Sequence, residues 1–182
     1  MSKSIIASFL FVTGAAALAG CATPAATTTS GATTPSLAEA LVATHIEVFD
    51  DLDFRVFTQQ KWAELHKSHS PDITVHWPDG HVTHGINQHI TDLSAMFVWG
   101  PDIRIKEHPV KFGQGEWTAV IGVMEGTFTK PMPIGDGKEI PPTGKAFKIQ
   151  MATIGHWKDG TMDEEYLFWD NQEFMRQLGL GK

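Results

Sequence analysis

The stretch GHWKDGTMDEEYLFWDNQEFMRQLGL, residues 155–180, decides the fold of this chain. Its Lys-Asp-Gly at 158–160 is typical of a hairpin turn, and the strand expected after that turn is crowded with aromatic residues. The periodicity then changes to that of a short amphipathic helix that ends at Gly179. Asp170 lies where the strand stops, and a charge at the end of an apolar strand is costly unless something uses it.

The rest of the chain predicts helices first and hairpin strands afterwards. Ser36-Leu-Ala-Glu39 is a capping box that opens one helix, and Pro71 ends a second helical run that starts near Thr58 and continues to about His69. We then expect a strand at 72–77, a turn, a helix at 85–97, and antiparallel strands at 103–112, 117–128, 146–157 and 162–169. This order predicts an α+β fold with helices packed on one face of a curved antiparallel sheet.

Residues 1–20 are predicted to be a signal peptide. Lys3 is followed by an apolar run at 5–18, which is too short for a comfortable transmembrane helix. The run closes on Leu-Ala-Gly-Cys at 18–21, which resembles the lipobox of bacterial lipoproteins. The resemblance implies cleavage before Cys21 and lipid attachment to it. An ordinary exported protein in which Cys21 is incidental is the alternative interpretation.

Residues 21–35 combine the lipidated Cys21 with a segment of Ala, Thr, Pro, Gly and Ser that is typical of a flexible tether. One folded domain is therefore expected at 36–182. Ala22 after the cysteine implies, by analogy with lipoprotein sorting, a lipid-anchored protein of the cell envelope, held at the outer membrane and facing the periplasm. Because Cys21 is the only cysteine, no disulfide is possible within the domain.

The charge balance argues against a nucleic-acid partner. The chain has 14 basic and 21 acidic residues and a net charge of −7, which becomes −8 when Lys3 is lost with the signal peptide. A nucleic-acid-binding protein needs a basic face to displace counterions from the phosphates. Contact with a membrane is expected only through the lipid anchor.

Several motifs, taken in order, resemble one family. They are His76 with Pro78 at a strand end, His84-Gly85 before a helix, Gly126-Thr127, Ile140-Pro-Pro-Thr-Gly-Lys145, Trp157-Lys-Asp-Gly160, Trp169-Asp170 and Gln177-Leu-Gly179. The sequence is similar to the SnoaL-like polyketide cyclases, also called ester cyclases, which have the nuclear transport factor 2-like fold. The resemblance implies a cone-shaped sheet with helices on its concave face, enclosing an apolar pocket. It also implies a cofactor-free aldol cyclisation with an Asp as general acid and base, and Asp170 is the matching residue.

Asp170 is the candidate catalytic residue. A single carboxyl group can remove a proton next to a carbonyl and later protonate the new alkoxide, provided an apolar pocket raises its pKa. Strand alternation places Tyr166 and Phe168 on the same face as Asp170 and predicts aromatic walls around it. Asp170 and Glu173 also form a capping box for the last helix, so capping alone is an equally open interpretation.

Four other side chains are predicted to contact a substrate: Tyr166, Phe168, Gln150 and His76. The hydroxyl of Tyr166 could polarise a carbonyl, although a buried aromatic with a purely structural role is the alternative. Gln150 could orient a substrate carbonyl, and His76 is expected to point inward while the neighbouring histidines are solvated. The histidine spacing fits no standard zinc pattern, so no metal is expected, and the resemblance implies that no other cofactor is needed.

The strand face opposite Asp170 carries Leu167 and Trp169. An apolar outer face suggests that a partner covers it, and we expect a homodimer. The Pro- and Gly-rich segment at 129–145 is either a lid over a binding site or an insertion tolerated at the surface.

The resemblance implies an enzyme that performs acid–base chemistry of the aldol cyclisation type on a small hydrophobic carbonyl compound. The alternative is a non-catalytic envelope lipoprotein that binds a hydrophobic ligand or a protein partner. Isomerase or hydrolase chemistry is a third possibility, and it would need a second acid or an arginine, such as Arg55 or Arg104, beside Asp170.

Overall fold

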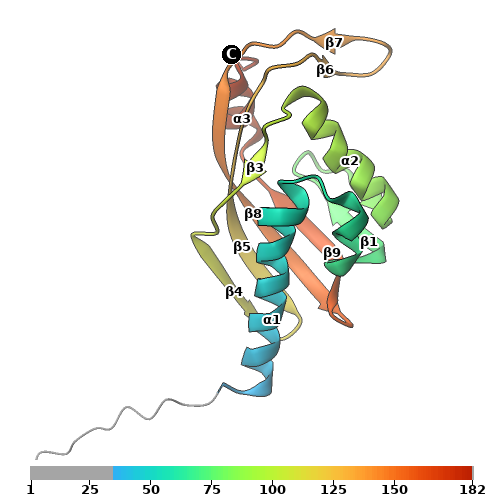
Figure 1. Cartoon of the computed structure of the whole chain (residues 1–182), viewed down its shortest axis with the longest axis vertical. Coiled ribbons are helices and arrows are strands. Elements are labelled where there is room, and N and C mark those ends of the chain that lie inside the picture. Colours follow the sequence, from blue (N-terminus) through green and yellow to red (C-terminus); the bar gives the residue numbers. More distant parts are fainter. Residues whose placement is uncertain (1–34, 182) are drawn as a thin grey trace, which may run out of the picture. The chain divides into compact units, whose positions relative to one another are not determined.

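The computed structural model describes residues 35–181, which fold as helices packed on a sheet (Figure 1). The helices are α1 (Leu37–Asp51), the π-helical turn η1 (Leu52–Phe57), the 3₁₀ helix η2 (Trp62–Lys67), α2 (Ile86–Trp99) and α3 (Asn171–Leu178). The strands are β1 (His69–His76), β2 (Val82–His84), β3 (Arg104–Ile105), β4 (Val110–Gln114), β5 (Trp117–Thr127), β6 (Met132–Pro133), β7 (Glu139–Ile140), β8 (Ala146–Lys158) and β9 (Thr161–Phe168).

The main sheet is curved and open, with the strand order β2-β1-β9-β8-β5-β3 and with β4 also paired to β5 (Figure 1). Its pairs are antiparallel except that of β1 and β9, which is parallel. The helices cover the concave face. The α+β class and the helices on the concave face, both predicted from the sequence, are confirmed.

The core lies between that concave face and the helices. Strand β8 alternates strictly: every second residue from Phe147 to Trp157 is buried, and the residues between them are exposed or half-buried. The ring of Trp157 stacks on His45 of α1 at 4.5 Å, and its Nε1 donates a hydrogen bond of 2.8 Å to the Thr118 hydroxyl. Each large apolar side chain buried in this way contributes about 1.5–3 kcal/mol relative to an exposed one.

The strand predicted at 103–112 is two strands. Arg104–Ile105 and Val110–Gln114 both pair with β5, and the segment between them leaves the regular ladder. Pro109 lies at this break and has no N–H to give to a ladder. The break matters for the site because it contains His108.

The helical run predicted from Thr58 to about His69 is also shorter than expected. The 3₁₀ helix ends at Lys67, and β1 begins at His69, two residues before Pro71. The pairing of β1 with β9 shifts register between His69 and Thr74, so Pro71 is accommodated in an irregular stretch of strand.

A β-bulge in β9 reverses the side-chain alternation of the closing strand. In the ladder with β8, Trp157 pairs with Met162 and His156 pairs with Glu164, so Asp163 is the extra residue. Met162 points into the core before the bulge, and Glu165 and Leu167 point into it afterwards. The prediction that Tyr166, Phe168 and Asp170 face inward was wrong. Tyr166 and Phe168 share a face of β9 as expected, but it is the outer face, because the core side of the strand is taken by Glu165 and Leu167.

Residues 35–181 contain no helix that is long and apolar enough to cross a membrane. The predicted signal peptide, Cys21 and the tether lie outside the described residues. The 129–145 connection holds the two-residue strands β6 and β7, which pair with each other.

Candidate active site

A pocket lies between the concave face of the sheet and the elements η1 and α2. The space between its walls measures about 470 Å³, part of it open to solvent. Its apolar and aromatic lining comes from Leu52, Phe57, Trp77, Leu93, Met96, Ile105, Met124, Met151, Leu167 and Trp169, and its polar lining from Asp53, His69, His89, Thr153 and Glu165. An apolar pocket with a few convergent polar groups is the usual form of a small-molecule site.

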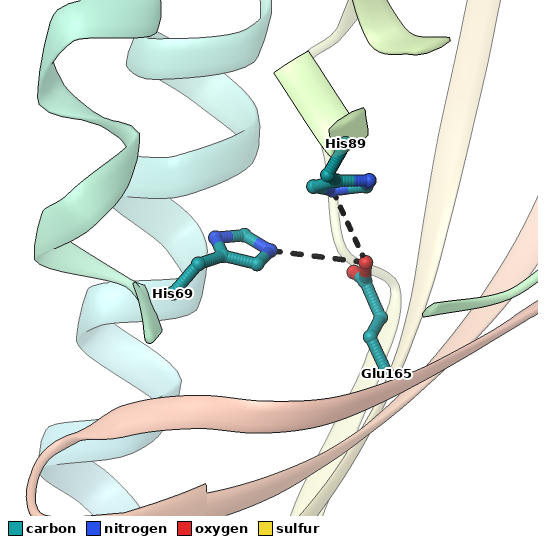
Figure 2. Close-up of side chains that lie close together, drawn as sticks. All are labelled: His69, His89 and Glu165. Atoms are coloured by element: carbon teal, nitrogen blue, oxygen red, sulfur yellow. Dashed lines mark ion pairs between the residues drawn. The ribbon is translucent and has the colours of Figure 1, made fainter. Parts of the chain in front are cut away.

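Three of the polar side chains meet in the pocket wall, as Figure 2 shows. The Oε2 atom of Glu165 lies 3.3 Å from Nε2 of His89 and 3.7 Å from Nε2 of His69. The residues are almost completely buried, with exposed fractions of 4% for Glu165, 1% for His69 and 2% for His89. We call these three residues the His–Glu–His cluster.

Each member of the cluster is placed by a different element. Glu165 is turned inward by the bulge of β9, and bulges often re-aim side chains next to active sites. His69 opens β1, where it pairs with Met162 of β9. His89 shares one face of α2 with Leu93 and Phe97, so burial of that apolar face carries the imidazole into the pocket.

The ring of His69 is held by its neighbour Ser68. The Ser68 hydroxyl donates to the Leu65 carbonyl at 3.1 Å and lies 2.9 Å from Nδ1 of His69. Nε2 of His69 faces the carboxyl group of Glu165 at 3.7 Å. A proton can therefore be shared between this nitrogen and the carboxyl group.

Buried polar atoms without a hydrogen-bond partner gather at the pocket. Within residues 35–181 they include Nε2 of His69, Nδ1 of His89, Oε2 of Glu165 and Nε1 of Trp169, all four from pocket-lining residues. Buried polar groups are normally satisfied, and an unsatisfied one calls for an explanation such as a bound molecule or water. The pocket thus offers donors and acceptors that the protein itself does not use.

Burial and neighbouring groups set the protonation of the cluster. Burial lowers the pKa of His89 to about 4, so this imidazole is neutral at pH 7. Burial alone would raise the pKa of Glu165, but the two neighbouring imidazoles outweigh it and lower that pKa. At neutral pH the cluster therefore presents an ionised carboxylate, which can accept a proton, beside a neutral imidazole.

The same three side chains could also hold a metal ion. Their ligand atoms lie within 4.8 Å of one another, and two imidazoles with one carboxylate are a donor set that zinc and iron accept. The prediction that the histidines other than His76 are solvated was wrong for His69 and His89. His69 is buried because β1 starts earlier than expected, and His89 is buried because it lies on the face of α2 that packs on the core.

A second buried carboxyl group reaches the pocket from η1. Asp53 lines the pocket, and its Oδ2 is 2.8 Å from Nε2 of His108. The other ring nitrogen of His108 is 2.8 Å from Oδ1 of Asp50, whose second oxygen is bonded by Lys111. The imidazole of His108, with 1% of its side chain exposed, thus bridges two carboxylates.

Asp170, the predicted catalytic residue, is exposed and is not among the residues that line the pocket. Its Oδ1 accepts hydrogen bonds from the backbone N–H groups of Gln172 at 2.9 Å and Glu173 at 3.0 Å. These bonds make Asp170 the N-cap of α3. Its predicted place in the pocket wall was wrong.

The four predicted substrate-binding residues also lie away from the pocket lining. His76 and Tyr166 stack at 4.1 Å on the outer face and both bond to Oε1 of Glu164. Gln150 and Phe168 are exposed. Conversely, Leu167 and Trp169, which were assigned to the outer face, line the pocket. The two sets were exchanged because the inward face was chosen from the expected role of Asp170, whereas the structure turns the face of Glu165 and Leu167 toward the core.

The sequence analysis missed Glu165, His69, His89 and Asp53. A run of three acids at 163–165 beside an apolar strand is a signal for Glu165, because at least one of its carboxyl groups must then face a core. Helical spacing from His89 to Leu93 and Phe97 is a signal for His89. Neither signal shows that the two residues meet.

The model of the SnoaL-like polyketide cyclase family matches residues 38–178. No curated protein sequence is significantly similar to the chain.

Solved structures share the fold at low identity. A protein of Jannaschia sp. CCS1 described as a SnoaL-like polyketide cyclase superposes with a TM-score of 0.68 at 18% identity, over 82% of this chain and 99% of its own. IdmH of Streptomyces antibioticus, described as a polyketide cyclase, gives 0.62 at 21% identity over 74% and 98%. An NTF2-like protein of unknown function from Burkholderia pseudomallei K96243 gives 0.60 at 14% identity over 74% and 97%.

Proposed function

The chain belongs to the SnoaL-like polyketide cyclase family, and we propose that it performs cyclase-type acid–base chemistry on a small hydrophobic carbonyl compound bound in the pocket. In this proposal Glu165 is the general base and acid, and His69 and His89 hold and modulate its carboxyl group. The proposal differs from the sequence-based hypothesis in the residue that moves the proton and agrees with it in the class of reaction.

One observation carries the proposal: a nearly fully buried carboxylate with an unpartnered oxygen lies in the wall of an apolar pocket. Burying a charge costs free energy when the charge has no close partner. A carboxylate that a β-bulge turns into the core therefore needs a functional explanation. A proton acceptor in a water-poor cavity is what removal of an α-proton requires.

The chemistry follows from the free atoms of the cluster. Oε2 of Glu165 takes a proton from the carbon next to a carbonyl group, and the electron pair of the C–H bond forms an enolate. The enolate carbon attacks a second carbonyl carbon of the same molecule, and the alkoxide that results takes the proton back from Glu165. Nε2 of His69, which faces the carboxyl group at 3.7 Å, can share the proton in between.

Proton abstraction can be tested without knowing the natural substrate. A small cyclic 1,4-diketone in D₂O serves as the probe, because its α-protons exchange slowly in neutral water, and ¹H NMR measures that exchange. We expect the protein to accelerate the exchange and Glu165→Gln to lose at least about 100-fold of that acceleration, as is typical for a general base. Glu164→Gln is the matched control, because Glu164 is the neighbouring acid on the outer face and bonds to His76 and Tyr166 there.

Two results would overturn the proposal. Exchange by Glu165→Gln at the rate of the unchanged protein would remove Glu165 from the reaction. Exchange that a chelator abolishes and added Zn²⁺ restores would instead assign the His–Glu–His cluster to a metal ion, for which its donor atoms are suited.

A further inference from the structure

Asp53 is the other carboxyl group of the pocket, and it enters from the helical side. It belongs to η1, whereas Glu165 belongs to the sheet. Only 8% of Asp53 is exposed. Oδ2 accepts a hydrogen bond from His108, and no hydrogen bond within residues 35–181 engages Oδ1. One oxygen of Asp53 is therefore held while the other is available to a molecule in the pocket.

The π-helical turn is the local cause of this position. Backbone N–H groups of Thr58 and Lys61 bond five residues back, to the carbonyls of Asp53 and Val56, at 3.3 and 2.7 Å. Such a turn is wider than an α-helical one, and π-helical turns are rare and frequent at functional sites. It follows α1 directly, so that Asp50 at the end of α1 and Asp53 in the turn both reach His108.

The ring of His108 is fixed from several sides. Phe54 packs on it at 4.4 Å and Phe49 meets it edge-on at 5.7 Å. Both ring nitrogens are bonded to carboxylates, so the imidazole cannot rotate without losing two hydrogen bonds. A fixed imidazole in turn fixes the Asp53 carboxyl group.

A structural clamp does not account for the whole arrangement. The bond from His108 to Asp50 already ties α1 to the break between β3 and β4, near the surface where Asp50 is partly exposed. Asp53 adds a second carboxyl group, on the side of His108 that faces the apolar pocket. An apolar residue could fill the same space without the cost of burying a carboxyl group. The additional carboxyl group is therefore best explained by what it faces.

We propose that Asp53 is a second catalytic group of the pocket, which hands a proton to the carbonyl oxygen of the bound substrate while Glu165 removes the α-proton. This inference rests on the proposed function. It assigns His108 and Asp50 as positioning residues, because they act on the substrate only through Asp53.

Every proton and electron pair of the step is accounted for. As Glu165 takes the α-proton, the C–H electron pair forms a C=C bond, and the carbonyl oxygen takes the proton from the Asp53 carboxyl group to give an enol. When the enol carbon forms the new C–C bond, the enol oxygen becomes a carbonyl again and returns its proton to Asp53. The new alkoxide oxygen takes the proton held by Glu165. Both carboxyl groups end in their starting states.

The surroundings supply the proton that this step needs. Burial raises the pKa of Asp53 in spite of the bond from His108 that lowers it. Burial alone would lower the pKa of His108, but its bonds to Asp53 and Asp50 outweigh burial and raise it. Asp53 and His108 titrate as a pair, and both pKa shifts favour keeping a proton on that pair. The charged or titratable groups near Asp53 are His108, Glu165 and His69.

A nitrophenol is a suitable probe for the contact with Asp53, because its phenolate oxygen imitates the enolate and its colour reports ionisation. Two variants separate donation from proton transfer. Asp53→Asn keeps an amide that can donate a hydrogen bond but cannot transfer a proton at neutral pH, and Asp53→Leu removes the donor. We expect Asp53→Asn to bind the nitrophenolate a few-fold more weakly than the unchanged protein does. Asp53→Leu should bind it roughly 100-fold more weakly, which is the effect expected for the loss of an oxyanion donor.

The diketone exchange assay completes the test. Asp53→Asn should lose about 10- to 100-fold of the exchange rate even though it still binds the nitrophenolate. Asp51→Asn is the matched control, since Asp51 is exposed at the end of α1 and pairs with Arg55. His108→Gln, which retains a donor toward Asp53, should lower the maximal exchange rate more than the apparent diketone affinity and shift its pH profile. Thermal unfolding of each variant identifies loss of fold.

The outcomes separate this inference from the function on which it rests. Asp53 has no catalytic role if Asp53→Leu binds the nitrophenolate as tightly as the unchanged protein does. The same holds if Asp53→Asn exchanges the diketone protons at the unchanged rate. Either result overturns this inference, whatever the effect of Glu165→Gln. A different result is that the unchanged protein fails to exchange the diketone protons while its nitrophenolate binding still depends on Asp53. That result overturns the proposed reaction and keeps Asp53 as the contact to a ligand oxyanion.

Discussion

Asp170 and Glu165 show how differently two carboxyl groups of the same closing segment can be placed. Asp170 is exposed and satisfied by two backbone N–H groups, so its charge stabilises the start of α3. Glu165 is buried, and one of its oxygens lacks a hydrogen-bond partner within residues 35–181. The first arrangement is a helix cap, and the second is the group to which we assign the proton transfer.

Removal of the cap should cost stability and leave chemistry intact. Asp170→Ala deletes the acceptor for the N–H groups of Gln172 and Glu173 and should lower the free energy of unfolding by about 1 kcal/mol. Asp170→Asn caps equally well, so its free energy of unfolding should lie within a few tenths of a kcal/mol of that of the unchanged protein. Urea unfolding measures both effects, and diketone exchange by either variant should match the unchanged protein. A large loss of exchange in Asp170→Asn would return Asp170 to the catalytic role predicted from sequence.

His89 should make stability sensitive to acid. Its pKa is about 4 in the folded protein against an ordinary value of 6.5, so between these values the unfolded chain binds a proton that the folded chain does not. Stability from this residue is therefore complete above pH 6.5 and falls by roughly 3 kcal/mol as the pH drops to 4. Unfolding midpoints at several pH values measure the slope. His89→Gln should flatten it over this window, and an unchanged slope would contradict the assignment.

Among the elements, those with local signals are predictable. The capping box at Ser36 predicts α1, and the structure confirms it with both hydrogen bonds of the box. The Lys-Asp-Gly turn at 158–160 likewise predicts the hairpin of β8 and β9. The bulge at Asp163 and the parallel pairing of β1 with β9 leave no comparable signal, because they depend on partners distant in the chain. The site residues are missed for the same reason, since the bulge decides which face of β9 carries Glu165.

Deletion of Asp163 tests the importance of the bulge. Without the extra residue, β9 must either turn Glu165 and Leu167 outward or lose its ladder with β8. We expect a loss of at least about 3 kcal/mol of unfolding free energy, comparable to the loss of a large core side chain, together with loss of diketone exchange. Asp163→Ser is the control, since it keeps the residue count. A deletion variant with unchanged stability and exchange would show that the bulge does not set the side-chain direction.

For the molecule as a whole, the outer face of the sheet carries the apolar surface that a partner would cover. Phe112, Trp117 and Ile154 border one exposed hollow of this face, and Phe168 is half exposed nearby on β9. We propose that a second copy of the chain covers it, as the sequence suggested, but through these residues and not through Leu167 and Trp169.

The dimer can be tested with one charge. Ile154→Lys should convert a dimer of the soluble chain, begun at residue 22, into a monomer in light scattering, because an unpaired charge at the centre of an apolar interface is strongly unfavourable. Val98→Lys is the control, because Val98 is an exposed apolar residue on α2, away from this face. A monomeric mass for the unchanged chain would exclude the dimer.

We also propose that Cys21 anchors the protein to the cell envelope, on the sequence alone. Cys21→Ser should move the protein from the membrane fraction to the soluble periplasmic fraction and abolish incorporation of labelled fatty acid. A variant that stays with the outer membrane would contradict the anchor.

The parallel pairing of β1 and β9 has a consequence for how the protein acquires its activity. His69 and Glu165 are separated by most of the folded domain's sequence, and their strands become neighbours only when the last hairpin has docked. Such pairings raise the contact order and slow folding, because a long loop must close before any of its contacts form. The pocket therefore needs the last strand of the chain, because β9 joins β1 to β8 and carries Glu165.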